Sequence, residues 1–150
     1  MARMQLAEEV HAPTGIVFDY VDQHAHCPEF FKGFCNFEWT SPLHRVGSRL
    51  KMDGRSAGAT LSIEVETSAV VPEREISSVF VSGLRGHWEW LFQPIQGGTR
   101  VTVIIDYDIP QDLPMQANDR SMLDRALRSC MEKTLRALKE HVESQMPVIA

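Results

Sequence analysis

The sequence lacks the features that mark three large classes of protein. Its three cysteines, Cys27, Cys35 and Cys130, are odd in number and widely spaced, which predicts free thiols in a reducing compartment and no disulfide framework. The net charge is −5 without any basic cluster, which argues against a nucleic-acid partner. No apolar run approaches the roughly 20 residues of a membrane-spanning helix, and the first residues lack the apolar segment of a secretory signal. We therefore expect a cytoplasmic protein with no membrane span.

Signatures of cofactor binding and covalent catalysis are also missing. There is no Gly-Xaa-Ser-Xaa-Gly elbow, no phosphate-binding loop and no dinucleotide fingerprint, so we predict no cofactor. The main concentration of metal-ligand chemistry is His24, His26 and Cys27, with Cys35 downstream. Its spacing matches no metal signature, and histidines two residues apart do not converge on a helix as an i, i+4 pair does. We predict no metal and interpret this cluster as a partly exposed cap over a pocket mouth.

The composition that is present is that of one globular domain over residues 1–150, with 43% hydrophobic and 23% charged residues. Alternating polarity predicts a first strand over residues 3–10. Pro13 and helical spacing then predict a short helix to Val21, followed by a second short helix or turn over residues 22–31. Six further strands joined by short turns, an antiparallel meander, are predicted at residues 34–41, 47–53, 59–71, 74–82, 87–94 and 100–109.

A long amphipathic helix is predicted to follow a proline-containing loop at residues 110–118. Asn118 or Asp119 can cap its first turn, and the pattern continues to about Gln145. At roughly 27 residues and 1.5 Å per residue, this helix is about 40 Å long, so only a sheet of comparable length can cover it. Its apolar stripe, with steps of three and four, is Leu123, Leu127, Met131, Leu135, Leu138 and Val142.

The last two strands form a hairpin around a Gly97-Gly98 turn. We predict its register from Ile95 opposite Arg100, since directly opposed residues of an antiparallel pair share one side of the sheet. The facing pairs are then Phe92 with Val103, Trp90 with Ile105, and Trp88 with Tyr107. One face is aromatic and apolar while the other is polar, which is typical of a sheet with a single covered face.

Several short sequences along the chain are fold signatures, and none of them is a catalytic motif. They are Ala12-Pro13, Val17-Phe18, Asp22, Pro28-Glu29-Phe30-Phe31, Gly47-Ser48, Pro72-Glu73-Arg74, Trp90 to Pro94, Gly97 to Thr102 and Leu135 to Lys139. With these signatures, nearly the whole chain resembles the START-like superfamily, also called SRPBCC, in its polyketide cyclase/dehydrase and lipid transport branch. The resemblance implies an α+β helix-grip fold: a bent seven-stranded antiparallel sheet around a long C-terminal helix, with two short helices after the first strand. It also implies a hydrophobic molecule held between the sheet and the helix.

The covered face of the hairpin is the best candidate for a pocket wall, because ligand pockets are mostly apolar with a few placed polar groups. Tyr107 is the polar candidate, since a buried phenol needs a hydrogen-bond partner and a ligand oxygen would serve. The alternative is that these side chains only pack against the long helix. In the strand over residues 74–82, either Ile76, Ser78 and Phe80 or Ser77, Val79 and Val81 face inward. The predicted ligand-binding residues are Trp88, Trp90, Phe92, Val103, Ile105, Tyr107, Leu61, Ile63, Met122, Ala126, Leu127 and Cys130.

Three functions stay open at this point. The leading hypothesis is a protein that binds a small hydrophobic ligand: a lipid, a quinone, an aromatic or a polyketide-like molecule. The second is a polyketide aromatase/cyclase that orients a poly-ketone without covalent catalysis. His87, Glu89 and Asp106 fall on the outward face, so no catalytic residue is assigned. The third is a protein-interaction module, because Pro28 to Phe31 followed by Cys35 loosely resembles ribosome- or quinone-associated relatives. An edge strand allows a homodimer, which nothing in the sequence requires.

Overall fold

A computed structural model of the chain describes residues 2–56, 59–109 and 117–146. Within this part of the chain, seven strands form one antiparallel sheet in the order β1-β7-β6-β5-β4-β3-β2. The strands are β1 (Ala2–Val10), β2 (Phe34–Trp39), β3 (Arg49–Ser56), β4 (Ala59–Val71), β5 (Glu75–Ser82), β6 (Arg85–Ile95) and β7 (Gly98–Asp108). The predicted meander runs from β2 to β7, and β1 joins it by pairing with β7.

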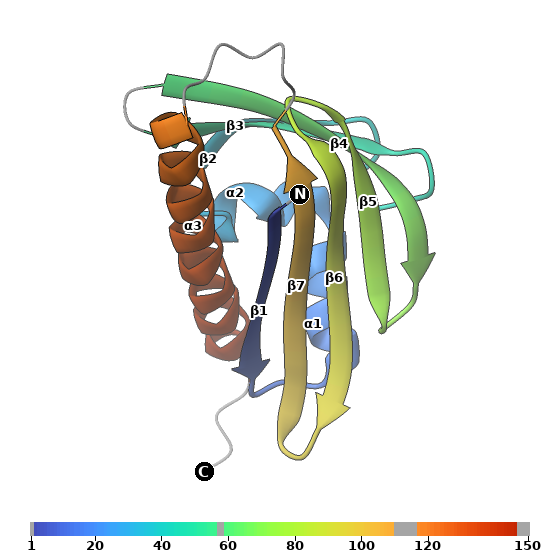
Figure 1. Cartoon of the computed structure of the whole chain (residues 1–150). Helices are drawn as coiled ribbons and strands as arrows, with labels where there is room; N and C mark the ends of the chain where they lie inside the picture. Colours follow the sequence, from blue (N-terminus) through green and yellow to red (C-terminus); the bar gives the residue numbers. More distant parts are fainter. Residues whose placement is uncertain (1, 57–58, 110–116, 147–150) are drawn as a thin grey trace.

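The sheet is curved, and the long helix α3 (Ala117–Ser144) lies along its concave side (Figure 1). In Figure 1, β1, β7 and β6 run beside the helix, whereas β3 and β4 cross near its N-terminal end. α3 contacts β1 and β3 as well as the short helices. This is the predicted α+β helix-grip fold, and it encloses what we call the interior, the space between the concave face and α3.

The segment between β1 and β2 covers one end of the interior. Helix α1 (Thr14–Asp22) begins directly after Pro13, one residue later than predicted, because Pro13 has an extended ψ of 147° and acts as the N-cap residue. The second predicted helix is divided into a 3₁₀ turn, η1 (His24–His26), and a single helical turn, α2 (Cys27–Phe30). Of the predicted loop at residues 110–118, residues 110–116 lie outside the described part of the chain, and residues 117 and 118 already belong to α3. The predicted capping side chains of Asn118 and Asp119 also lie outside the described part.

The register of the β6–β7 hairpin differs from the prediction by two residues. Ile95 pairs with Gly98, so the loop contains only Gln96 and Gly97. Gly97 has a φ of +84°, which glycine adopts without steric cost and which closes the shorter loop. The observed pairs are Trp88 with Ile105, Trp90 with Val103 and Phe92 with Val101. A slip of two residues leaves every side chain on its predicted face, so the assignment of the covered face was correct although the pairing was wrong.

The open question about the strand over residues 74–82 is answered by its neighbours. Ser78 lies opposite Trp88 and Ile76 lies opposite Trp90, so these residues share the concave face. Phe80 is on the same parity and is 9% exposed, whereas Val81 is 40% exposed. The predicted apolar stripe of α3 faces this surface, and its members from Leu127 to Val142 are buried.

Candidate functional site

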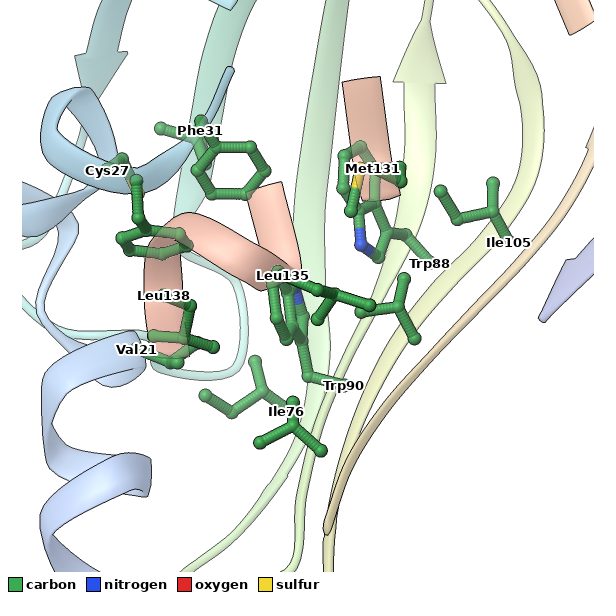
Figure 2. Packing of buried hydrophobic residues seen from close by; sticks show 14 of the residues in the cluster. Val21, Cys27, Phe31, Ile76, Trp88, Trp90, Ile105, Met131, Leu135 and Leu138 are labelled. Carbon is green, nitrogen blue, oxygen red and sulfur yellow. The ribbon is translucent and has the colours of Figure 1, made fainter. Parts of the chain in front are cut away.

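The interior is lined by aromatic side chains from two directions. On the sheet side, Trp88 and Trp90 of β6 are 3% and 5% exposed. From the helical side, Phe31 follows α2, and its ring centroid lies 5.8 Å from that of Trp88 and 6.0 Å from that of Trp90. Both contacts are close to edge-on, the geometry that aromatic pairs prefer. Figure 2 shows these side chains together with Met131, Leu135 and Leu138 of α3.

A small cavity lies within this aromatic region. It has a volume of about 20 Å³ and is lined by Val21, Phe31, His44, Leu50, Met52, Val65, Ser78, Trp88 and Trp90. Two of the lining residues are polar, and Trp88 adds an indole N–H. A volume of this size suits one water molecule or one ligand oxygen. The cavity is therefore a small polar site in an otherwise apolar wall.

A larger cleft opens to solvent near the first described turns of α3. Its volume is about 560 Å³, and it is lined by Ala2, Tyr107, Asp108, Ile109, Ser121, Asp124 and Arg125. This size falls within the range of about 300–1,000 Å³ that is usual for ligand sites. Tyr107 and Ile105 are two residues apart on β7, and Ile105 pairs with Trp88. The cleft and the aromatic wall therefore lie about 7 Å apart along one strand face.

Tyr107 and Asp124 form a short hydrogen bond at the cleft. The phenol donates a hydrogen bond of 2.5 Å to Asp124 Oδ1, so its partner is a carboxylate of the protein. Burial, the hydrogen bond and the carboxylate charge together raise the pKa of Tyr107 far above its ordinary value. The phenol therefore stays protonated at neutral pH and holds Asp124 at the edge of the cleft. Gly86 lies opposite Tyr107 on β6, so the cross-strand neighbour of Tyr107 has no side chain.

The predicted partly exposed cap is wrong for His24 and Cys27, whereas His26 and Cys35 are half-buried. His24 is fully buried, and its Nδ1 lies 2.6 Å from the carbonyl oxygen of Ser41. His44, from the β2–β3 connection, packs with a ring centroid 4.0 Å from that of His24. Cys27 is buried as well, and burial raises the pKa of its thiol to about 12. Among the described residues, no group of three or more His, Cys, Asp or Glu side chains is placed to hold a metal ion.

Residues 1–143 match the protein family described as polyketide cyclase/dehydrase and lipid transport. The chain belongs to this family. No curated protein sequence matches it. None of the described helices is long and apolar enough to cross a membrane.

Solved structures agree with this family in fold. TTHA0849 from Thermus thermophilus superposes with a TM-score of 0.83 at 17% identity, over 97% of this chain and 100% of that one. The ZhuI aromatase/cyclase of a Streptomyces species gives 0.80 at 14% identity, over 98% and 96% of the two chains. The di-domain aromatase/cyclase StfQ of the steffimycin pathway gives 0.75 at 15% identity, over 95% of this chain and 51% of that one. At these identities the similarity is one of fold.

The predicted ligand-binding residues of this family member divide into three groups. The sheet residues Ile63, Trp88, Trp90, Phe92, Val103, Ile105 and Tyr107 and the helix residue Leu127 are buried on the interior side. Leu61, Ala126 and Cys130 are half-buried. Met122 is 42% exposed. Successive side chains of an α-helix are rotated by about 100° around its axis. Met122 therefore points away from the apolar stripe, on the side of Leu123 opposite to Leu127.

Sequence reasoning missed three residues that contribute to the site. Asp124 lies outside the predicted apolar stripe of α3 and was not named as a site residue, although it directly follows Leu123 at the border of that stripe. Phe31 was noted only as part of a fold signature, although it contacts both interior tryptophans. His44 was assigned to a turn, and nothing in the pattern around it signals burial. Its place in the cavity wall depends on the fold of the β2–β3 connection.

Proposed function

We propose that the protein binds a small hydrophobic ligand in the interior, with the cleft beside Tyr107 as the entrance. The observation that supports this proposal is a ligand-sized cleft that lies about 7 Å from an aromatic wall along the same strand face. The cleft is lined by Tyr107 and Ile109 of the β7 end, and the wall by Trp88 and Trp90. Apolar surface in a concave site supplies binding free energy, and a few polar groups fix the orientation.

The flat, rigid side chains of the wall favour a ligand with aromatic or conjugated character. The ring of Phe31 lies 5.8 Å from that of Trp88 and 6.0 Å from that of Trp90, and both contacts are close to edge-on. A planar ligand placed among them gains both apolar burial and ring stacking, whereas a saturated chain gains only the former. Membership of a family described by polyketide cyclases and lipid transport agrees with both kinds of ligand.

Native mass spectrometry of the purified protein, followed by denaturation and identification of any released molecule, is the first test. A defined apolar or polycyclic molecule supports the proposal and names the ligand class. The absence of any bound mass, together with no thermal shift across lipids, quinones and aromatic polyketides, would contradict it. Such a result would direct the search to protein partners.

Tryptophan fluorescence supplies a second test that locates the ligand. The variant Trp39→Phe removes the one tryptophan outside the interior, which is 39% exposed, and leaves Trp88 and Trp90 as reporters. A bound aromatic ligand is expected to quench the emission of Trp39→Phe. Quenching of the wild-type protein that disappears in this variant would mean that the ligand binds outside the interior.

A second candidate function is ring closure of a poly-ketone, which the Tyr107–Asp124 pair favours. Asp124 and Asp108 are carboxylates of the cleft, and Tyr107 fixes the orientation of Asp124 through the 2.5 Å hydrogen bond. In this scheme Asp124 removes a proton from a carbon between two ketones, and the resulting enolate attacks a third carbonyl of the same chain. The carbon–carbon bond forms, the new alkoxide takes up the proton, and loss of water completes the unsaturated ring.

The test of this second function compares Asp124→Asn with Asp106→Asn. Asp106 is next to Tyr107 on β7 but points to the outer face, where it pairs with Arg3 at 3.5 Å. With a synthetic poly-β-ketone as substrate, Asp124→Asn is expected to lower cyclisation by about 10²–10⁴-fold, the usual contribution of a general base. Asp106→Asn should retain wild-type activity. Equal activity of the two variants would rule out Asp124 as the base while leaving ligand binding intact.

A further inference from the structure

We infer that the small cavity beside Trp88 is a subsite for one neutral ligand oxygen, received by Trp88 Nε1–H, the Ser78 hydroxyl and His44. The subsite selects hydrophobic molecules that carry a hydroxyl or enolised keto group at their inner end. This inference rests on the proposed ligand binding and deepens it, because it names the chemical class of the ligand. The cavity volume of about 20 Å³ accommodates one oxygen atom of the ligand or one water molecule.

The indole N–H of Trp88 is the first reason for a ligand here. The residue is 3% exposed, and among the described residues its Nε1 has no hydrogen-bond acceptor. A buried donor without a partner costs about 1–3 kcal/mol, so native structures rarely leave one unsatisfied. Trp88 lines the cavity, and an oxygen placed there supplies the missing acceptor.

Ser78 and His44 make the cavity polar on two further sides. Ser78 pairs with Trp88 across β5 and β6, so their Cβ atoms are about 5 Å apart on the concave face. His44 Nδ1 lies 2.9 Å from the carbonyl oxygen of Asp22, so Nδ1 carries the hydrogen and donates it. In the neutral ring, Nε2 then keeps its lone pair. The cavity thus offers a donor, a hydroxyl and an acceptor, which match a hydroxyl group of a ligand.

The surroundings of the cavity favour a neutral group over a carboxylate. Its described lining contains no Lys, Arg, Asp or Glu. Behind His44, burial together with the neighbouring imidazole lowers the pKa of His24 to about 4, so His24 carries no charge at neutral pH. Asp22 Oδ1 already lies 3.6 Å from His44 Nδ1, so a ligand carboxylate would lose its hydration beside a carboxylate of the protein, which is costly. A phenol or enol needs only the hydrogen bonds that Trp88, Ser78 and His44 can make.

Displacement of a neutral fluorescent reporter, 1-aminoanthracene, tests the inference with three probes. These are 1-naphthol, naphthalene and 1-naphthoate, which share the ring system and differ in the group presented to the cavity. The wild-type protein is expected to bind 1-naphthol about five- to tenfold more tightly than naphthalene, the ratio given by one net hydrogen bond. It is expected to bind 1-naphthoate most weakly.

Ser78→Ala should reduce this ratio towards one, and Ser77→Ala is its matched control. Ser77 is the adjacent residue of β5, on the opposite parity, and its hydroxyl donates to Glu75 Oε2 at 2.6 Å. Trp88→Phe removes the N–H but keeps an aromatic ring in the wall, so it provides a second variant. Thermal unfolding of each variant shows that the compared proteins are folded.

A naphthol-to-naphthalene ratio that falls in Ser78→Ala and Trp88→Phe but not in Ser77→Ala supports the subsite. A wild-type ratio near one, or a ratio unchanged in Ser78→Ala, overturns it and leaves the cavity as the site of a structural water. Tightest binding of 1-naphthoate overturns it as well. In each of these cases, displacement of the reporter by naphthalene still supports ligand binding in the interior. If the reporter does not bind to the protein, or if none of the three probes displaces it, the proposed function fails together with the subsite.

Discussion

Gly33 connects α2 to β2 and lies so close to α3 that an added methyl group would overlap with it. Its φ is +83°, and a Cβ at this position would lie 2.2 Å from Cys130 Sγ. Gly97 has almost the same φ, +84°, but a Cβ there would meet no atom within 4 Å. These two glycines therefore separate the cost of a left-handed backbone from the cost of steric overlap.

We expect Gly97→Ala to lower the free energy of unfolding by about 1–2 kcal/mol, the cost of this backbone conformation for an L-residue. Gly33→Ala adds the overlap with Cys130, about 1–3 kcal/mol, for a total of about 2–5 kcal/mol. In a Cys130→Ala background the sulfur is gone, and the remaining neighbour is the Cβ of residue 130 at 3.3 Å. The cost of Gly33→Ala should then fall close to that of Gly97→Ala.

Urea unfolding followed by circular dichroism gives the five free energies of unfolding that this comparison needs: those of the wild type, Gly33→Ala, Cys130→Ala, the double variant and Gly97→Ala. The coupling between Gly33→Ala and Cys130→Ala is expected to be about 1–3 kcal/mol in the favourable direction. A coupling near zero would refute the close packing of this segment on α3. The packing matters for the site, because the same segment carries Phe31 into the interior and Lys32 N–H donates to Thr134 Oγ1 at 3.0 Å.

Three further predictions concern buried groups. Burial lowers the pKa of His24 from 6.5 to about 4, so the unfolded state binds a proton on this residue more tightly than the folded state does. The free energy of unfolding should therefore fall by about 3 kcal/mol as the pH is lowered from 6.5 to about 4. In urea unfolding, His24→Gln should show a smaller dependence on pH than the wild type. Met131→Ala removes a fully buried side chain and should cost about 2–5 kcal/mol, against less than about 0.5 kcal/mol for the exposed Glu132→Ala, when thermal unfolding is compared. Tyr107→Phe leaves the carboxylate of Asp124 without its phenol donor and should cost about 1–3 kcal/mol in urea unfolding; an unchanged midpoint would contradict the hydrogen bond.

The elements of the fold were predictable because each one depends on a local pattern. The alternation along β6 and β7 identified the covered face, and the spacing from Leu127 to Val142 identified the buried side of α3. The pairing of β6 with β7 could not be predicted in the same way, because the adjacent glycines allow hairpin loops of different length. A shift of two residues preserves the alternation, so the pattern contains no information that distinguishes the two registers.

The candidate site depended on contacts between residues that are far apart in the chain. His44 reaches the cavity beside Trp88 only because the connection before β3 folds back over the interior. Asp124 meets Tyr107 only because the first described turns of α3 lie beside the end of β7. Neither residue differs in sequence from an ordinary exposed polar residue, since burial of a single side chain leaves no periodic signal.

The sequence by itself therefore determined the order of the elements, the faces that β6, β7 and α3 bury, and membership of the family. The order of the elements and the buried faces follow from hydrophobic periodicity and turn chemistry, which act over a few residues, whereas membership of the family follows from the match over residues 1–143. The tertiary structure alone decided the parity of β5, the partner of the Tyr107 phenol and the polar cavity beside Trp88. These features depend on contacts between residues that are far apart in the chain, and such contacts form only when the curved sheet closes on the helix.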